Sequence, residues 1–144
     1  PYLIIDTDMI NSFILAFKRG VDVRIVIPGI PDKKIVYDLT MSYVKNLVDA
    51  GIKVYTYTPG FIHSKIFVSD DNKATVGTIN LDYRSLYLHF ENGVYLEDVK
   101  EIEDILNDVN NIITESHLLT KKETNYNIFR KVWQSILRFF APLF

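Results

Sequence analysis

The chain has 144 residues, of which 48% are hydrophobic and 24% charged, a composition typical of one ordinary globular domain. Its formal net charge of −2 argues against nucleic-acid binding through a general basic field, and its lack of cysteine excludes disulfides and thiolate metal sites. No apolar run approaches the roughly 18–20 residues that a membrane-spanning helix needs.

The first part of the chain alternates between strand and helix patterns. Short runs with little polar alternation predict strands covered on both faces, at residues 2–5, 21–28 and 52–58. Apolar residues at helical spacing separate these runs and predict two helices, which end at Gly20 and Gly51. Asp6 or Thr7 is the expected N-cap of the first helix, and Asp32 of the second. This order predicts an α/β fold with a mixed, largely parallel sheet flanked by helices.

Residues 61–80, with the sequence FIHSKIFVSDDNKATVGTIN, predict a β-hairpin. The first eight residues alternate as a strand does, and ATVGTIN can return antiparallel to them. Asp71 and Asn72 are suited to a two-residue turn because both tolerate positive φ. A turn at these two residues fixes the register of the predicted hairpin.

This register brings four polar side chains to one patch. His63 and Lys65 share a face of the first strand, Thr78 is expected opposite Lys65, and Asn80 opposite His63. A group that can attack or transfer a proton, beside a cation and two hydrogen-bonding side chains, suits a phosphate ester. The ordinary alternative for a lone histidine, a place in the packed core, is disfavoured by this convergence.

The rest of the chain predicts one more strand and two helices. Residues 90–96 have a strand pattern, and residues 99–119 have a helical apolar stripe that is expected to pack on the sheet. We therefore expect a domain at residues 1–119, a polar linker at residues 120–127 and an amphipathic helix at residues 128–144.

The last helix has an apolar stripe that includes Ile128, Trp133 and Phe140, and its only charges are basic. Two placements remain open. The helix can lie on an anionic bilayer, with Trp133 near the lipid headgroups. Alternatively, it can dock on the protein's own core or on a part of the protein outside this chain.

The motif within residues 61–80 resembles the signature of the phospholipase D superfamily, H-x-K-x4-D followed by G-[ST]-x-N. Its positions are filled by His63, Lys65, Asp70, Gly77, Thr78 and Asn80. The segments TYTPGFIHSK and VGTINLDYRSLYLHFENGVYL resemble the C-terminal half of bacterial cardiolipin synthases, and the similarity covers roughly residues 1–96. Members of this type carry two such motifs, one in each half, whereas this chain has one. The chain is therefore expected to be a fragment, or one half, of a longer protein.

The resemblance implies a role for each polar residue of the patch. His63 is implied to be the nucleophile that forms a phosphohistidine or the general acid that protonates the leaving alkoxide. Lys65, Thr78 and Asn80 are implied to bind the phosphate. Lys65 already occupies the place of a cation, and the family's chemistry is metal-independent, so no metal or cofactor is expected.

Other acidic residues have more varied expected roles. The resemblance implies that Glu91 orients the imidazole through Nδ1 and fixes its tautomer. It also includes Asp70 in the catalytic motif, although a position next to the turn predicts structural contacts for this residue. Asp82 and Arg84 are expected to form an ion pair that supports the hairpin.

The resemblance implies phosphatidyl transfer between two phosphatidylglycerol molecules, which gives cardiolipin and glycerol. It implies work at an anionic membrane surface, on the cytoplasmic face of a bacterial cell membrane. A second motif-bearing half, from the same polypeptide or a homodimer partner, would complete the site. One alternative is a hydrolase, either a phospholipase D or a phosphodiesterase-type nuclease, although the acidic charge and apolar tail argue against nucleic acid. The other alternative is an inactive lipid-binding fragment.

Overall fold

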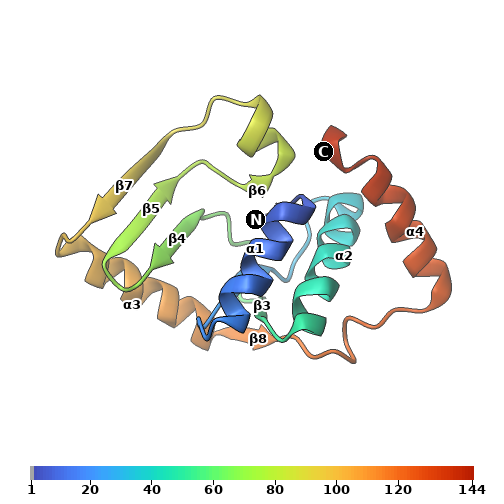
Figure 1. The fold of residues 1–144 in the computed structure, drawn as a ribbon, viewed down its shortest axis with the longest axis horizontal. Coiled ribbons are helices and arrows are strands. Elements are labelled where there is room, and N and C mark those ends of the chain that lie inside the picture. Colours follow the sequence, from blue (N-terminus) through green and yellow to red (C-terminus); the bar gives the residue numbers. More distant parts are fainter. Residues whose placement is uncertain (1) are drawn as a thin grey trace.

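A computed structural model describes residues 2–144, and the first part of the chain follows the predicted order of strands and helices (Figure 1). These elements are β1 (Leu3–Ile4), α1 (Thr7–Lys18), β2 (Arg24–Pro28), α2 (Lys34–Ala50) and β3 (Lys53–Tyr57). The later elements are β4 (Ile66–Ser69), β5 (Lys73–Gly77), β6 (Leu81–Asp82), the π-helical turn η1 (Arg84–Leu88), β7 (Gly93–Glu97), α3 (Glu101–Thr114), β8 (Ser116–Leu118), α4 (Ile128–Phe139) and the 3₁₀ turn η2 (Ala141–Leu143).

Local capping signals explain where the first two helices begin and end. Asp6 caps α1 by accepting a hydrogen bond of 2.8 Å from the backbone nitrogen of Met9, as predicted. Gly51 ends α2 with a left-handed φ of 103°, also as predicted. The predicted N-cap Asp32 is wrong, because α2 begins two residues later, at Lys34. The Asp32 carboxylate instead accepts hydrogen bonds from its neighbour's backbone nitrogen and from the hydroxyl of Tyr2.

The strands of residues 2–144 form three small sheets. In one, β1 pairs with β6 in parallel, and in another β3 lies between a parallel β2 and an antiparallel β8. The third sheet, β4–β5–β7, is antiparallel throughout. The mixed α/β class is confirmed, with a larger share of antiparallel pairing than predicted.

β8 is an element that the sequence pattern did not predict. The expected helix over residues 99–119 ends at Thr114, and the next residues form a short strand on the edge of β3, where Leu118 pairs with Tyr55. Three residues are too few for a visible alternation, and their partner lies far away in the sequence. Long-range pairing therefore overrides the continuing helical pattern.

The main core is built around α2, which contacts β1, α1, β3 and α4. Leu39, Val44 and Leu47 of α2 are fully buried, as is Val54 of β3. Figure 1 shows α1, α2 and α4 gathered on one side of the molecule, with the β4–β5–β7 sheet and α3 on the other. Among residues 2–144, no helix has both the length and the apolar character needed to cross a membrane.

Candidate functional site

Three segments meet at one end of the β4–β5–β7 sheet. Because neighbouring strands are antiparallel, β4 begins, β5 ends and β7 begins at the same end. The segments that extend from this end are residues 61–65, 78–80 and 89–92. They carry the predicted site residues His63, Lys65, Thr78, Asn80 and Glu91.

The predicted register of the hairpin is wrong by one residue. Ser69 pairs with Lys73, so the loop contains three residues, and both Asp70 and Asp71 have positive φ, 54° and 59°. Aspartate tolerates this conformation, so the two aspartates form the turn that was expected at Asp71 and Asn72.

The shift changes what faces His63 and Lys65. Gly77, not Thr78, lies opposite Lys65, and its backbone nitrogen donates a 3.2 Å hydrogen bond to the Lys65 carbonyl oxygen. β4 begins only at Ile66, so His63 lies before the strand and the predicted pairing with Asn80 does not form. His63 and Lys65 are still close together, because both belong to the segment that leads into β4.

The ammonium of Lys65 contacts the imidazole of His63 directly. Lys65 Nζ lies 3.1 Å from each ring nitrogen and donates a 2.6 Å hydrogen bond to the His63 carbonyl oxygen. Partial desolvation, followed by the charge of Lys65, lowers the pKa of His63 below its ordinary value. The neutral imidazole, which has a free lone pair, is therefore favoured near neutral pH.

Lys65 is a partly buried cation without a close counter-charge. None of the ion pairs formed within residues 2–144 includes this side chain. Desolvation lowers the pKa of Lys65, while the carboxylates of Glu91 and Asp82 act on it in the opposite direction. A charge in this state is stabilised when an anion binds beside it.

Thr78 and Glu91 form a second contact in the same region. The Thr78 hydroxyl donates a hydrogen bond to the Glu91 carboxylate and accepts one of 3.0 Å from the backbone nitrogen of Asn92. The bond from Thr78, followed by one from Ser85, lowers the pKa of Glu91. Glu91 therefore holds Thr78 in this structure, whereas its expected bond to the imidazole of His63 is not formed.

The Oδ1 atom of Asn80 is buried and has no hydrogen-bond partner. It is the only such side-chain nitrogen or oxygen in residues 2–144. Leaving such an acceptor unpaired costs about 1–3 kcal/mol. The cost is removed if a bound group or a nearby protonated side chain supplies a donor. Asn80 thus has the character of a residue in an incomplete polar site.

Asp70 lies at the opposite end of β4 from the other motif residues. The four strand residues between Lys65 and Asp70 span about 13 Å. The Asp70 carboxylate accepts a 3.2 Å hydrogen bond from the hydroxyl of Ser69. Its position favours the structural role expected from the turn over a place in the catalytic group.

Asp82 has a role that the sequence reasoning missed. Its side chain is buried, and Oδ1 accepts a 2.7 Å hydrogen bond from the backbone nitrogen of Ser85. No ion pair of the described residues contains Arg84, so the predicted Asp82–Arg84 pair is wrong. The signal was available in the spacing, since an aspartate three residues before a backbone donor is a common cap of a helical turn.

Gly77 is required where β5 approaches β7. A Cβ atom at this position would lie 2.2 Å from the carbonyl oxygen of Asn92 and 2.6 Å from the Cα atom of Gly93. Both neighbours are backbone atoms, so relief requires the strands to move apart. The glycine therefore holds together the two segments that carry Thr78 and Glu91.

We expect Gly77→Ala to lower the free energy of unfolding by about 1–3 kcal/mol, because the added methyl group overpacks the β5–β7 contact. Urea unfolding followed by circular dichroism measures the change. Gly60→Ala is the matched control, since a Cβ atom there meets nothing within 4 Å. Its effect should stay within about 0.5 kcal/mol. Equal stability of the two variants would contradict the expected strand contact.

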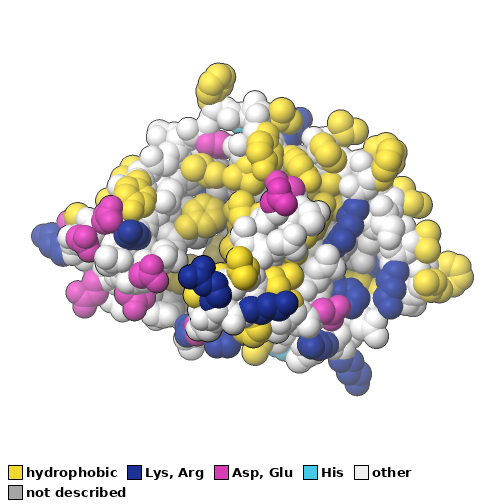
Figure 2. Space-filling view, in the orientation of Figure 1, with side chains coloured by type: hydrophobic (Ala, Val, Ile, Leu, Met, Phe, Trp, Pro, Cys, Tyr) yellow, Lys and Arg dark blue, Asp and Glu magenta, His cyan; other side chains and the backbone are white. Residues whose placement is uncertain are grey.

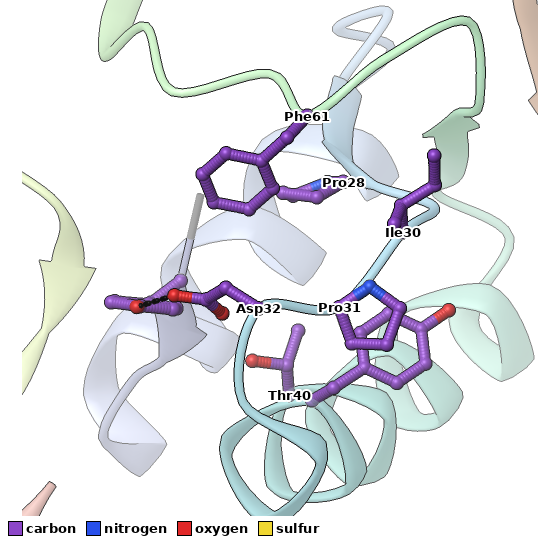
Figure 3. Close-up of a pocket in the computed structure, with 8 residues that line it drawn as sticks. Pro28, Ile30, Pro31, Asp32, Thr40 and Phe61 are labelled. Carbon is purple, nitrogen blue, oxygen red and sulfur yellow. Dashed lines mark hydrogen bonds between the residues drawn. The ribbon is translucent and has the colours of Figure 1, made fainter.

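Figure 3 shows a small cavity beside Phe61, lined by Pro28, Ile30 and Asp32 among others. Its volume of about 10 Å³ does not exceed what a single water needs, so it is a packing gap. Phe61 also lies 5.8 Å from His63, measured between ring centroids. The packing of Phe61 thus helps to position the exposed imidazole two residues later.

A larger groove of about 590 Å³ lies between α1, α2 and the end of α4, and its lining includes Asn11, Asn46 and Arg138. Neither cavity contains His63 or Lys65. The His63 side chain is instead exposed to solvent, and that of Lys65 is partly buried beside it. Among residues 2–144, no three His, Asp or Glu side chains gather as a metal site would require.

Residues 1–113 match the family described as "Cardiolipin synthase, PLD-like domain". The chain belongs to this family. The resemblance to cardiolipin synthases found in the motif is thereby confirmed, and it extends well beyond the motif itself.

Proteins with similar sequences support the same family membership. The chain is 45% identical to an uncharacterised protein of Streptococcus mutans, 39% identical to cardiolipin synthase 1 of Staphylococcus aureus strain COL, and 38% identical to a cardiolipin synthase of Halalkalibacterium halodurans. Each alignment covers 99% of this chain but only 29–31% of the relative. The chain thus spans about three tenths of the length of these relatives.

Two solved structures share the fold. The phospholipase D family member Nuc of Salmonella typhimurium superposes with a TM-score of 0.71 at 21% identity, covering 83% of this chain and 78% of that one. The phosphatidylserine synthase of Haemophilus influenzae gives a TM-score of 0.72 at 18% identity, covering 99% of this chain and 38% of that one. The phospholipase D-like fold of the chain is therefore confirmed.

Proposed function

We propose that this chain provides one half of a phosphatidyltransferase that converts two phosphatidylglycerol molecules into cardiolipin and glycerol. The observation that carries the proposal is the contact between the His63 imidazole and the Lys65 ammonium at the end of the β4–β5–β7 sheet. The imidazole has a lowered pKa, and the ammonium has no ion-pair partner within residues 2–144, which supports the proposal of a nucleophile beside a site for an anion. The family membership supports a phosphatidyl group as the substrate.

As the nucleophile, a ring nitrogen of His63 would attack the phosphorus of one phosphatidylglycerol. A nitrogen–phosphorus bond forms, the bond from phosphorus to the glycerol oxygen breaks, and a general acid protonates the leaving glycerol. The hydroxyl of a second phosphatidylglycerol then attacks phosphorus and gives its proton to the group that protonated the glycerol, now acting as a general base, which breaks the nitrogen–phosphorus bond and yields cardiolipin. One phosphodiester replaces another, so the reaction consumes no nucleotide.

The other motif-bearing half would supply the second histidine, so that one histidine attacks and the other protonates. The exposure of His63 supports this arrangement, because an open surface does not exclude water from a phosphohistidine. The short span of the chain relative to its relatives agrees with a missing half. That half belongs either to the same polypeptide or to a second copy of the protein.

The test is to incubate the chain with phosphatidylglycerol vesicles, with and without the N-terminal half of a related synthase, and to separate the lipid products by chromatography. We expect cardiolipin only in the mixture of both halves. Phosphatidic acid in place of cardiolipin would show that water is the acceptor and that the protein is a hydrolase. Cleavage of a soluble DNA phosphodiester would favour a nuclease. Absence of any product with both halves present would favour an inactive lipid-binding fragment.

A further inference from the structure

The C-terminal helix α4 docks on α2 mainly through polar side chains, together with Leu137, which is buried in the hydrophobic core. Arg130 Nη2 lies 2.5 Å from the carboxylate of Asp38, and Gln134 Nε2 donates a 3.2 Å hydrogen bond to the carbonyl oxygen of the same residue. Near the end of the helix, Arg138 Nε donates a 2.9 Å hydrogen bond to the hydroxyl of Ser42. An ordinary surface helix turns its apolar side toward the protein, whereas Leu137 is the one apolar residue that α4 buries.

The docked helix leaves its apolar side exposed, and we call this surface the apolar face of α4. It consists of Ile128, Phe129, Val132, Trp133, Ile136 and Phe139. The side chains of Phe129 and Phe139 are 83% and 81% exposed, respectively. Figure 2 shows hydrophobic side chains along the edge of the molecule that α4 forms in Figure 1. Of the two placements left open by the sequence, the structure shows docking on the protein's own core, and most of the apolar stripe stays uncovered.

The contacts with α2 hold α4 in this orientation. The guanidinium of Arg130 lies 3.8 Å from the ring centroid of Tyr126, and that of Arg138 lies 4.6 Å from the ring centroid of Tyr43. Together with the bonds to α2, these stacking contacts oppose rotation of the helix about its axis. Covering the apolar face with this domain's own core would require all of them to break.

The charges of the C-terminal region favour an anionic surface. The chain as a whole is acidic, yet no acidic residue follows Glu123. Lys121, Lys122 and Lys131 belong to this C-terminal region, and none of them takes part in an ion pair of residues 2–144. An amphipathic helix with large apolar side chains, a single tryptophan and only basic charges is typical of helices that lie in the interface of an anionic bilayer.

We propose that the apolar face of α4 inserts into the headgroup and acyl boundary of a bilayer that contains anionic lipid, while the polar side of the helix remains bonded to α2. The domain is then held on the membrane in a fixed orientation and does not hang from a flexible tail. This contact is independent of the proposed phosphatidyl transfer, because it involves neither His63 nor Lys65.

Trp133 provides a direct measurement, because it is the only tryptophan in the 144 residues. Its side chain is exposed, so its fluorescence should shift to shorter wavelength when the chain binds phosphatidylglycerol vesicles. Acyl chains brominated near the headgroup should quench it. High salt should weaken the binding, because screening reduces the attraction between lysines and lipid phosphates.

Paired variants distinguish membrane binding by the apolar face of α4 from nonspecific binding by other exposed apolar side chains. Phe129→Ser combined with Phe139→Ser should weaken vesicle binding at least about tenfold, because two exposed aromatic side chains no longer enter the interface. The control is Leu15→Ser combined with Val21→Ser, which removes two exposed apolar side chains from another part of the surface. This control should bind within about twofold of the parent.

Three results would overturn the proposal. The first is vesicle binding that is equal in the parent and the Phe129/Phe139 variant. The second is a parent protein that, without lipid, elutes as a dimer and has a blue-shifted Trp133 spectrum, while the Phe129/Phe139 variant elutes as a monomer. A second copy of the chain would then cover the apolar face. The third is a shift of Trp133 emission caused by the complementary synthase half in the absence of vesicles. None of these measurements depends on turnover, so they do not test the proposed chemistry.

Discussion

Replacing His63 with alanine is expected to reduce cardiolipin formation at least about a hundredfold, which corresponds to about 2.7 kcal/mol of transition-state stabilisation. The alanine side chain can neither attack phosphorus nor protonate an alkoxide. The assay combines the chain with the complementary half of a related synthase and phosphatidylglycerol vesicles. Because the His63 side chain is exposed, the free energy of unfolding should change by less than about 0.5 kcal/mol.

His117→Ala is the matched control for this variant. His117 lies in β8, where its Nε2 atom is 2.7 Å from the carboxylate of Glu123, and it has no place in the motif. Its loss should leave cardiolipin formation nearly unchanged. If His63→Ala keeps more than a hundredth of the parent activity while the parent is fully active, the catalytic assignment of His63 is wrong.

Lys65→Gln is expected to lower cardiolipin formation by about 10²–10³-fold, because the variant lacks the charge that would bind the phosphate and stabilise its transition state. It should also raise the pKa of His63 toward its ordinary value. Desolvation and the nearby ammonium both lower this pKa in the parent, and the variant retains only the first of these causes. An NMR titration of the His63 ring protons measures the shift.

The sign of the pH effect follows from the same contact. A higher pKa means that His63 becomes protonated at higher pH, so the acid limb of the activity profile should move to higher pH if the neutral imidazole is the nucleophile. Lys73→Gln is the control, because it removes another lysine of the same hairpin. The Nζ atom of Lys73 lies 3.2 Å from the carboxylate of Glu97. An unchanged titration of His63 in Lys65→Gln would contradict the direct contact between the two side chains.

The elements that were predicted well depend on local signals. Asp6 and Gly51 act within one helical turn, so their capping roles could be inferred from the residues around them. The expected proximity of His63 and Lys65 is also observed, because two residues so close in the chain stay close in an extended segment. These features do not depend on how distant elements pack.

The predictions that failed depend on choices that local patterns leave open. Three consecutive residues, Asp70 to Asn72, tolerate a turn, and choosing the wrong pair shifted the register by one residue. The placement of α4 was left open for a related reason, since periodicity defines an apolar stripe but not which side of the helix faces α2. The bonds of Arg130 and Gln134 to Asp38 decide this, and they join residues more than ninety positions apart.

The partner of Glu91 is a similar case. The resemblance assigned its carboxylate to the imidazole, whereas the structure gives it to the hydroxyl of Thr78. Thr78 becomes available to Glu91 because Gly77 allows β5 and β7 to approach closely. Such a pairing follows from the sheet and could not be inferred from the spacing of the residues.

The separation of the hairpin's two ends has a practical consequence. His63 and Lys65 precede one end of β4, while the loop of Asp70 and Asp71 lies at the other end and is exposed to solvent. This loop is therefore a suitable place to attach a fluorophore or insert an epitope without altering the chemistry. A label there would report the height and tilt of the domain above a bilayer while His63 and Lys65 remain unmodified.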